Sequence, residues 1–79
     1  MALKFYTRPD CHLCDLAWDV LEQAGLNSEV IMVNIEDDVE LLRKYGLRIP
    51  VIHDPDLDRE IGWPFSQQDL QKLFGNAQE

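Results

Sequence analysis

The feature that most constrains this chain is a pair of cysteines placed where a strand pattern gives way to a helix pattern. Residues 3–6 alternate apolar and polar side chains, which is typical of a half-buried strand. After a short loop, apolar residues recur at helical spacing over residues 11–24, and Asp10 is predicted as the helix N-cap. Cys11 and Cys14 therefore lie in the first turn of a predicted helix and share one of its faces.

The predicted position of Cys11 favours reactive thiol chemistry. The first N–H groups of a helix have no intrahelical partner, and together with the helix dipole they stabilise a thiolate. A thiolate attacks disulfide sulfurs, and Cys14 lies close enough to resolve the mixed disulfide that results. We therefore predict a dithiol that exchanges with disulfides, with Cys11 as nucleophile and Cys14 as resolving thiol. The pKa of the Cys11 thiol is expected below the free value of about 8.5.

Three other interpretations of the cysteine pair are open. The two residues are small and apolar enough to serve only as core residues. A zinc site needs about four ligands, and the candidates are Cys11, Cys14, His12 and His53, so no metal site is expected within one chain. In the third interpretation, two copies of the chain share an iron–sulfur cluster through Cys11.

The remaining elements follow from the same kinds of signal. Residues 29–34 hold an unbroken apolar run, as expected of a strand covered on both faces. The other predicted features are a stop of the first helix at Gly25, a second helix capped by Asp37 with Glu40 and ended by Gly46, strands at 50–53 and 59–62 around an acidic turn, and a last helix capped by Ser66 with Asp69.

The resulting order, β-α-β-α-β-β-α, predicts an α/β fold. The first β-α-β unit should have parallel strands and the last two strands should form an antiparallel hairpin. This gives a mixed four-stranded sheet with helices on both faces. The chain has 79 residues, so we expect one domain covering residues 1–79.

Charge and hydropathy exclude several classes of function. Fifteen acidic residues face seven basic ones, for a formal net charge of -8, which disfavours nucleic acid and anionic membranes as partners. The start of the chain is too polar for an apolar leader segment, so we expect a cytoplasmic protein. We also expect the protein to be a monomer. Disulfides are rare in a reducing cytosol, and a bridge between Cys11 and Cys14 would close a loop too short to add much stability. The cysteine pair is therefore not expected to be a structural staple.

Two segments carry a family resemblance. Tyr6-Thr7-Arg8-Pro9-Asp10, followed by Cys11-His12-Leu13-Cys14, resembles the end of the first strand and the Cys-x-x-Cys motif of glutaredoxins, which have the thioredoxin fold. Arg48-Ile49-Pro50-Val51 is similar to the Thr-Val-Pro segment of that family. The resemblance covers nearly the whole chain, and the Cys-His-Leu-Cys start is similar to a branch of small bacterial glutaredoxin-like proteins. It implies a cis Pro50, whose neighbour Ile49 would keep its backbone N–H and C=O free to pair with an extended substrate.

The resemblance also implies an activity and a set of binding residues. It indicates a thiol–disulfide oxidoreductase that requires no cofactor, takes a disulfide-containing protein or glutathione as partner, and has glutathione as a candidate reductant. The candidate substrate-binding or glutathione-binding residues are Arg8, His12, Arg48, Ile49, Pro50, Gly62 and Ser66. The sequence departs from the family pattern between the two cysteines and in the segment Gly62-Trp63-Pro64-Phe65-Ser66. Two alternatives therefore stay open: a module that binds glutathione or an iron–sulfur cluster, and a non-catalytic interaction domain.

Overall fold

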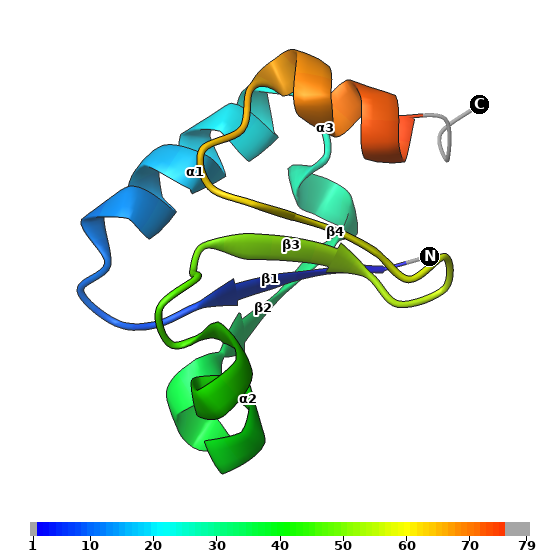
Figure 1. The fold of residues 1–79 in the computed structure, drawn as a ribbon. Coiled ribbons are helices and arrows are strands. Elements are labelled where there is room, and N and C mark those ends of the chain that lie inside the picture. The colour runs from blue at the N-terminus through cyan, green and yellow to red at the C-terminus, as the bar shows by residue number, and fades with distance from the viewer. Residues whose placement is uncertain (1, 76–79) are drawn as a thin grey trace.

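The computed structural model describes residues 2–75, which form helices and strands in the predicted order (Figure 1). Met1 and residues 76–79 of the predicted domain lie outside this range. The elements are β1 (Leu3–Thr7), α1 (His12–Gln23), β2 (Val30–Asn34), α2 (Val39–Tyr45), β3 (Val51–Asp54), β4 (Arg59–Gly62) and α3 (Gln67–Phe74), with short 3₁₀ helices at Asn27–Glu29 and Ile35–Asp37. The ends of each strand lie within one residue of the predicted positions.

The strands form a mixed sheet with the order β2-β1-β3-β4. β1 runs parallel to β2 and antiparallel to β3, and β3 forms an antiparallel hairpin with β4. Figure 1 shows α1 and α3 on one face of the sheet and α2 on the other. The predicted fold class is confirmed.

The core divides between the two faces of the sheet because side chains alternate along each strand. Leu3 and Phe5 of β1 point to the face covered by α1 and α3, where they pack in one cluster with Leu21 and Leu70. Tyr6 points to the other face and packs in a second cluster with Ile35, Tyr45 and Val51. The sheet is therefore held from both sides, and its central strands β1 and β3 are the most buried.

The strand β2 differs from its prediction. It lies at an edge of the sheet, and Ile31 and Met32 are 54% and 56% exposed, so the expectation of a strand covered on both faces is wrong. Helix α1 packs over the neighbouring strand β1, where Trp18 meets Phe5 edge-on with ring centroids 5.5 Å apart. Of the β2 side chains, Val30 and Val33 pack partly against the two core clusters, whereas Ile31 and Met32 are left open to solvent.

The end of α1 and both ends of α2 follow the predicted chemistry with one shift. Gly25 has φ +77°, a left-handed conformation that suits glycine after a helix, and it ends α1 as predicted. The N-cap of α2 is Asp38 and not Asp37, because Asp37 belongs to the preceding 3₁₀ turn and the Asp38 side chain accepts the Glu40 N–H at 2.8 Å. Gly46 ends α2, as predicted.

Candidate active site

Cys11 is itself the N-cap of α1. Its backbone is extended (φ -101°, ψ 101°), and its Sγ accepts a hydrogen bond from the Cys14 N–H at 3.2 Å. The prediction of Asp10 as N-cap is wrong, because Asp10 sits in the preceding turn with φ +59°. At the N-cap, Cys11 Sγ takes the place of the usual capping oxygen and accepts a helix N–H directly, which is the environment predicted to favour its thiolate.

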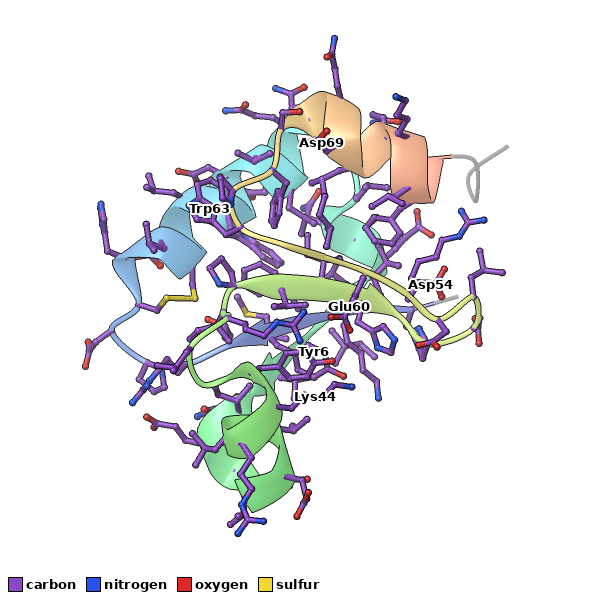
Figure 2. All side chains as sticks on the ribbon, in the orientation of Figure 1. Tyr6, Lys44, Asp54, Glu60, Trp63 and Asp69 are labelled. Atoms are coloured by element: carbon purple, nitrogen blue, oxygen red, sulfur yellow. A yellow bond between two sulfur atoms is a disulfide. The ribbon has the colours of Figure 1, made fainter. Side chains whose placement is uncertain are left out.

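Cys11 and Cys14 form a disulfide, with their Cα atoms 5.2 Å apart. Figure 2 shows the sulfur–sulfur bond at the start of α1. Cys14 is buried, with 4% of its surface exposed, whereas Cys11 is only partly buried. Cys11 is therefore the more accessible of the two cysteines, and Cys14 belongs to the core cluster behind it.

The sheet register brings a second segment to the same edge as the cysteine loop. Tyr6 pairs with Val51, so the end of β1 that leads to Cys11 lies beside the start of β3 that follows Pro50. The Ile49–Pro50 bond is cis, as predicted, and the Pro50 C=O accepts the Trp63 N–H at 3.0 Å. The Trp63–Pro64 bond is also cis, which the sequence reasoning did not foresee.

The backbone N–H of Ile49 is already used. It donates to the Tyr45 C=O at 3.0 Å, and the Arg48 N–H donates to the same oxygen at 2.8 Å. The expectation that the Ile49 N–H stays free for a substrate is therefore wrong. The carbonyl groups in the last turn of a helix lack intrahelical donors, and the end of α2 takes its donors from this loop.

Both candidate arginines are paired with carboxylates. Arg8 Nη2 lies 2.8 Å from Glu36 Oε2 at the surface. Arg48 forms an ion pair with Glu60, which also accepts a hydrogen bond from the Tyr45 hydroxyl at 3.2 Å. The Arg48 hydrogen bond holds the pKa of Glu60 below its usual value. Sequence reasoning missed both partners, because Glu36 and Glu60 are far from the arginines along the chain.

The start of α3 is closed by a capping box, as predicted. The Ser66 Oγ accepts the Asp69 N–H at 3.1 Å, and the Ser66 N–H donates to Asp69 Oδ2 at 2.9 Å. The hydroxyl and amide of Ser66 are thus used within the helix, and a carboxylate stands beside them. Gly62, at the end of β4, and His12, at the start of α1, are exposed. The binding roles of Arg8, His12, Arg48, Ile49, Pro50, Gly62 and Ser66 stay predictions.

A groove beside the disulfide was not foreseen from the sequence. It comprises a hollow of 220 Å³ that Cys14 and Trp18 help to line and a hollow of 480 Å³ that Cys11 and Asn34 help to line. Thr7, Asp15 and Met32 line both hollows. The groove exists because β2 is an edge strand and leaves Met32 uncovered next to α1.

The described residues offer neither a metal site nor a membrane span. Within residues 2–75, no three His, Cys, Asp or Glu side chains come close enough together to hold a metal ion. None of the helices in this part of the chain has the length and apolar character to cross a bilayer.

The fold and the cysteine pair together define a glutaredoxin-like protein of the thioredoxin fold. The chain belongs to the family described as "Glutaredoxin-like domain (DUF836)", whose model matches residues 2–75. The chain is similar to the crystal structure of the structural genomics target XcR50 from X. campestris, with 44% identity, a TM-score of 0.84, and coverage of 95% of this chain and 97% of that one. The solution structure of XcR50 gives 45% identity, a TM-score of 0.84 and coverage of 96% and 95%. The search of curated proteins found no match.

Proposed function

We propose that this protein is a dithiol–disulfide oxidoreductase with Cys11 as nucleophile and Cys14 as resolving thiol. One observation carries the proposal: a partly exposed cysteine at the N-cap of α1 is bonded to a buried cysteine one turn later. The N–H groups at the start of the helix favour the Cys11 thiolate once the pair is reduced. Because Cys14 is buried, it reacts only after Cys11 has formed a mixed disulfide with the substrate.

The proposed reaction transfers two electrons and two protons to the partner. The Cys11 thiolate attacks one sulfur of a partner disulfide, which forms a mixed disulfide and releases the first partner thiolate. Cys14, on losing its proton, then attacks Cys11 Sγ, which forms the Cys11–Cys14 disulfide and releases the second partner thiolate. The two partner thiolates take up the protons that the dithiol has lost. A thiol reductant must then supply two electrons and two protons to restore the dithiol.

We propose a protein or peptide disulfide ahead of glutathione as the partner. Glutathione carries two carboxylates, and both arginines offered for them are paired with Glu36 and Glu60. The Ser66 amide and hydroxyl are used by Asp69, whose carboxylate would repel a glutathione carboxylate at the start of α3. Glutathione as the thiol reductant stays a prediction, with two glutathione molecules oxidised in each cycle.

The test is a redox titration followed by thiol alkylation. The protein is equilibrated with defined ratios of reduced and oxidised glutathione, treated with N-ethylmaleimide, and analysed by mass spectrometry. We expect a single two-electron transition between a form with two alkyl groups and a form with none. A dithiol that stays fully alkylated across all ratios would contradict the proposal.

A turnover assay then shows whether the cysteine pair catalyses disulfide reduction or only forms a reversible disulfide. The wild-type protein and Cys11→Ser are compared in the reduction of a peptide disulfide, with dithiothreitol as electron source. We expect the variant to fall to the uncatalysed rate. Glutathione replaces dithiothreitol in a second series, and reduction above background there would support the glutathione-linked cycle. A Cys11→Ser variant as active as wild type would rule out catalysis by this pair.

A further inference from the structure

We propose that the groove between α1 and β2 selects the substrate, and that it fits a peptide with an apolar side chain and basic residues next to its disulfide. This inference rests on the proposed function and specifies the class of partner. It concerns a surface on the β2 side of the cysteines, which includes Arg8 of the candidate glutathione-binding residues but lies apart from the Arg48–Pro50 loop and the start of α3.

The position of the groove makes it the natural path for a chain that reaches the disulfide. One hollow is lined by Cys11 and the other by Cys14, and both share Asp15 and Met32. Figure 1 shows that α1 starts at one end of the sheet and runs across its face. A substrate with a sulfur held at Cys11 would therefore lay its neighbouring residues along the flank of α1 and across the open side of β2.

Part of the lining of the groove is apolar. Met32 is 56% exposed, although its neighbour in the sheet register, Phe5, is fully buried. Trp18 packs edge-on against Phe5 and also lines the hollow beside Cys14. Methionine is flexible and polarizable, so it accepts side chains of different shapes. An apolar side chain near the substrate cysteine would gain contact area here by covering Met32.

Another part of the lining of the groove is acidic. Asp15 lines both hollows, Asp10 lines the hollow beside Cys11, and Asp19 lines the hollow beside Cys14. The one cation that lines either hollow within the described residues is Arg8, and its charge is offset by Glu36 at 2.8 Å. Such a groove attracts Lys or Arg and repels Asp or Glu in the segment that enters it.

The magnitude of this preference follows from exposed charges in water. One charge pair at about 7 Å changes the rate of productive encounter by about threefold at low ionic strength, so two pairs change this rate by about tenfold. The effect should shrink strongly near 1 M salt, where the screening length is about 3 Å. Charge selection of this size is large enough to measure with matched peptides.

The experiment compares the reduced, full-length protein with three disulfide substrates in single-turnover reactions. Two are peptide disulfides of the same length that differ only in the charge of the residues flanking cysteine, lysine in one and glutamate in the other. The third is the neutral bis(2-hydroxyethyl) disulfide. The variants are Asp15→Asn and Asp19→Asn, with Glu22→Gln as matched control, because Glu22 is an exposed acid on α1 that lines neither hollow.

The readout is the ratio of the lysine-peptide rate to the glutamate-peptide rate within each variant. This ratio cancels any change that a substitution makes in the intrinsic reactivity of Cys11. We expect a ratio of about 100 in the wild type at low salt, since the lysine peptide reacts about tenfold faster, and the glutamate peptide about tenfold more slowly, than an uncharged peptide would. We expect the ratio to fall several-fold in each aspartate variant and to stay unchanged in Glu22→Gln.

A further arm tests the apolar part of the lining. Met32→Ser is expected to slow a lysine peptide that carries leucine next to cysteine more than one that carries glycine there. Equal wild-type rates for the two charged peptides, or a ratio that neither aspartate substitution alters, would overturn the inference while leaving the proposed function standing. Failure to react even with the neutral disulfide would overturn the proposed function, and the inference with it.

Discussion

The Sγ atom of Cys11 accepts a hydrogen bond from the backbone N–H of Cys14 at 3.2 Å, in the same turn in which the two sulfurs are bonded. The N-cap of α1 is thus a sulfur in place of an oxygen. When the disulfide is reduced, the same N–H is available to the Cys11 thiolate, because it belongs to the helix backbone. This relationship links the fold directly to the proposed chemistry.

The first prediction concerns the pKa of the Cys11 thiol in the reduced protein. Hydrogen bonding to the helix N-terminus should lower this pKa below the free value of about 8.5. The measurement is the ultraviolet absorbance of the thiolate against pH in Cys14→Ser, where Cys11 is the only cysteine. A pKa at or above the free value would show that the helix terminus does not activate this sulfur.

The second prediction concerns the cluster of Arg48, Tyr45 and Glu60. The pKa of Glu60 is lowered, first by the Arg48 hydrogen bond, so its ion pair stabilises the fold above the unfolded-state pKa of about 4.3. This stabilisation is lost as pH falls through the folded-state pKa of Glu60. Glu60→Gln should cost about 1 kcal/mol at pH 7, since Glu60 and Arg48 are partly exposed.

Urea unfolding of wild type and Glu60→Gln as a function of pH tests this cluster. The gap between their free energies of unfolding should close as the solution is acidified below the folded-state pKa of Glu60. Glu40→Gln is the control, because Glu40 lies 4.0 Å from Arg43 with both side chains largely exposed. A gap that is constant over the whole pH range would mean that the Glu60 charge does not contribute.

The third prediction concerns the capping box of α3. Ser66→Ala removes the acceptor of the Asp69 N–H and should cost about 1 kcal/mol. For a domain of this size, that loss lowers Tm by about 4–8 °C. Thermal unfolding of Gln68→Ala serves as control, because Gln68 is an exposed residue in the first turn of the same helix. Equal Tm values for the two variants would refute the capping role.

The fourth prediction isolates backbone conformation at Gly25. An alanine Cβ at this position would meet no atom within 4 Å, so the cost of Gly25→Ala comes from φ +77° alone. We expect a loss of about 1–2 kcal/mol in the free energy of unfolding. Gly25→Asn should lose less, because asparagine tolerates the left-handed region better. Identical losses for the two variants would point to a cause other than φ.

Much of the fold could be predicted from the sequence because its signals are local. The cap at Ser66, the stop at Gly25 and the strand–helix switch before Cys11 each depend on a few neighbouring residues. The errors at Asp10 and Asp37 have the same local origin, since each lies one residue before a side chain that also accepts a backbone N–H.

The parts that failed depend on the order of strands and on distant partners. The apolar run of β2 is the same whether the strand is central or at an edge, so its exposure could not be read from periodicity. The pairing of Arg8 with Glu36 arises only when two distant loops are brought together by the sheet. The use of the Ile49 N–H by the Tyr45 C=O is instead a local contact at the end of α2, which the family resemblance did not indicate. The groove beside the disulfide depends on the edge position of β2 and shares this limit.

The most direct test of the central claim is to stop the reaction halfway. Reduced Cys14→Ser is mixed with bis(2-hydroxyethyl) disulfide and analysed by intact mass and peptide mapping, with Cys11→Ser treated in parallel. We predict a stable mixed disulfide with mercaptoethanol on Cys11 in the first variant, and far slower modification of the buried Cys14 in the second. Faster modification of Cys14 than of Cys11 would contradict the assignment of nucleophile and resolving thiol.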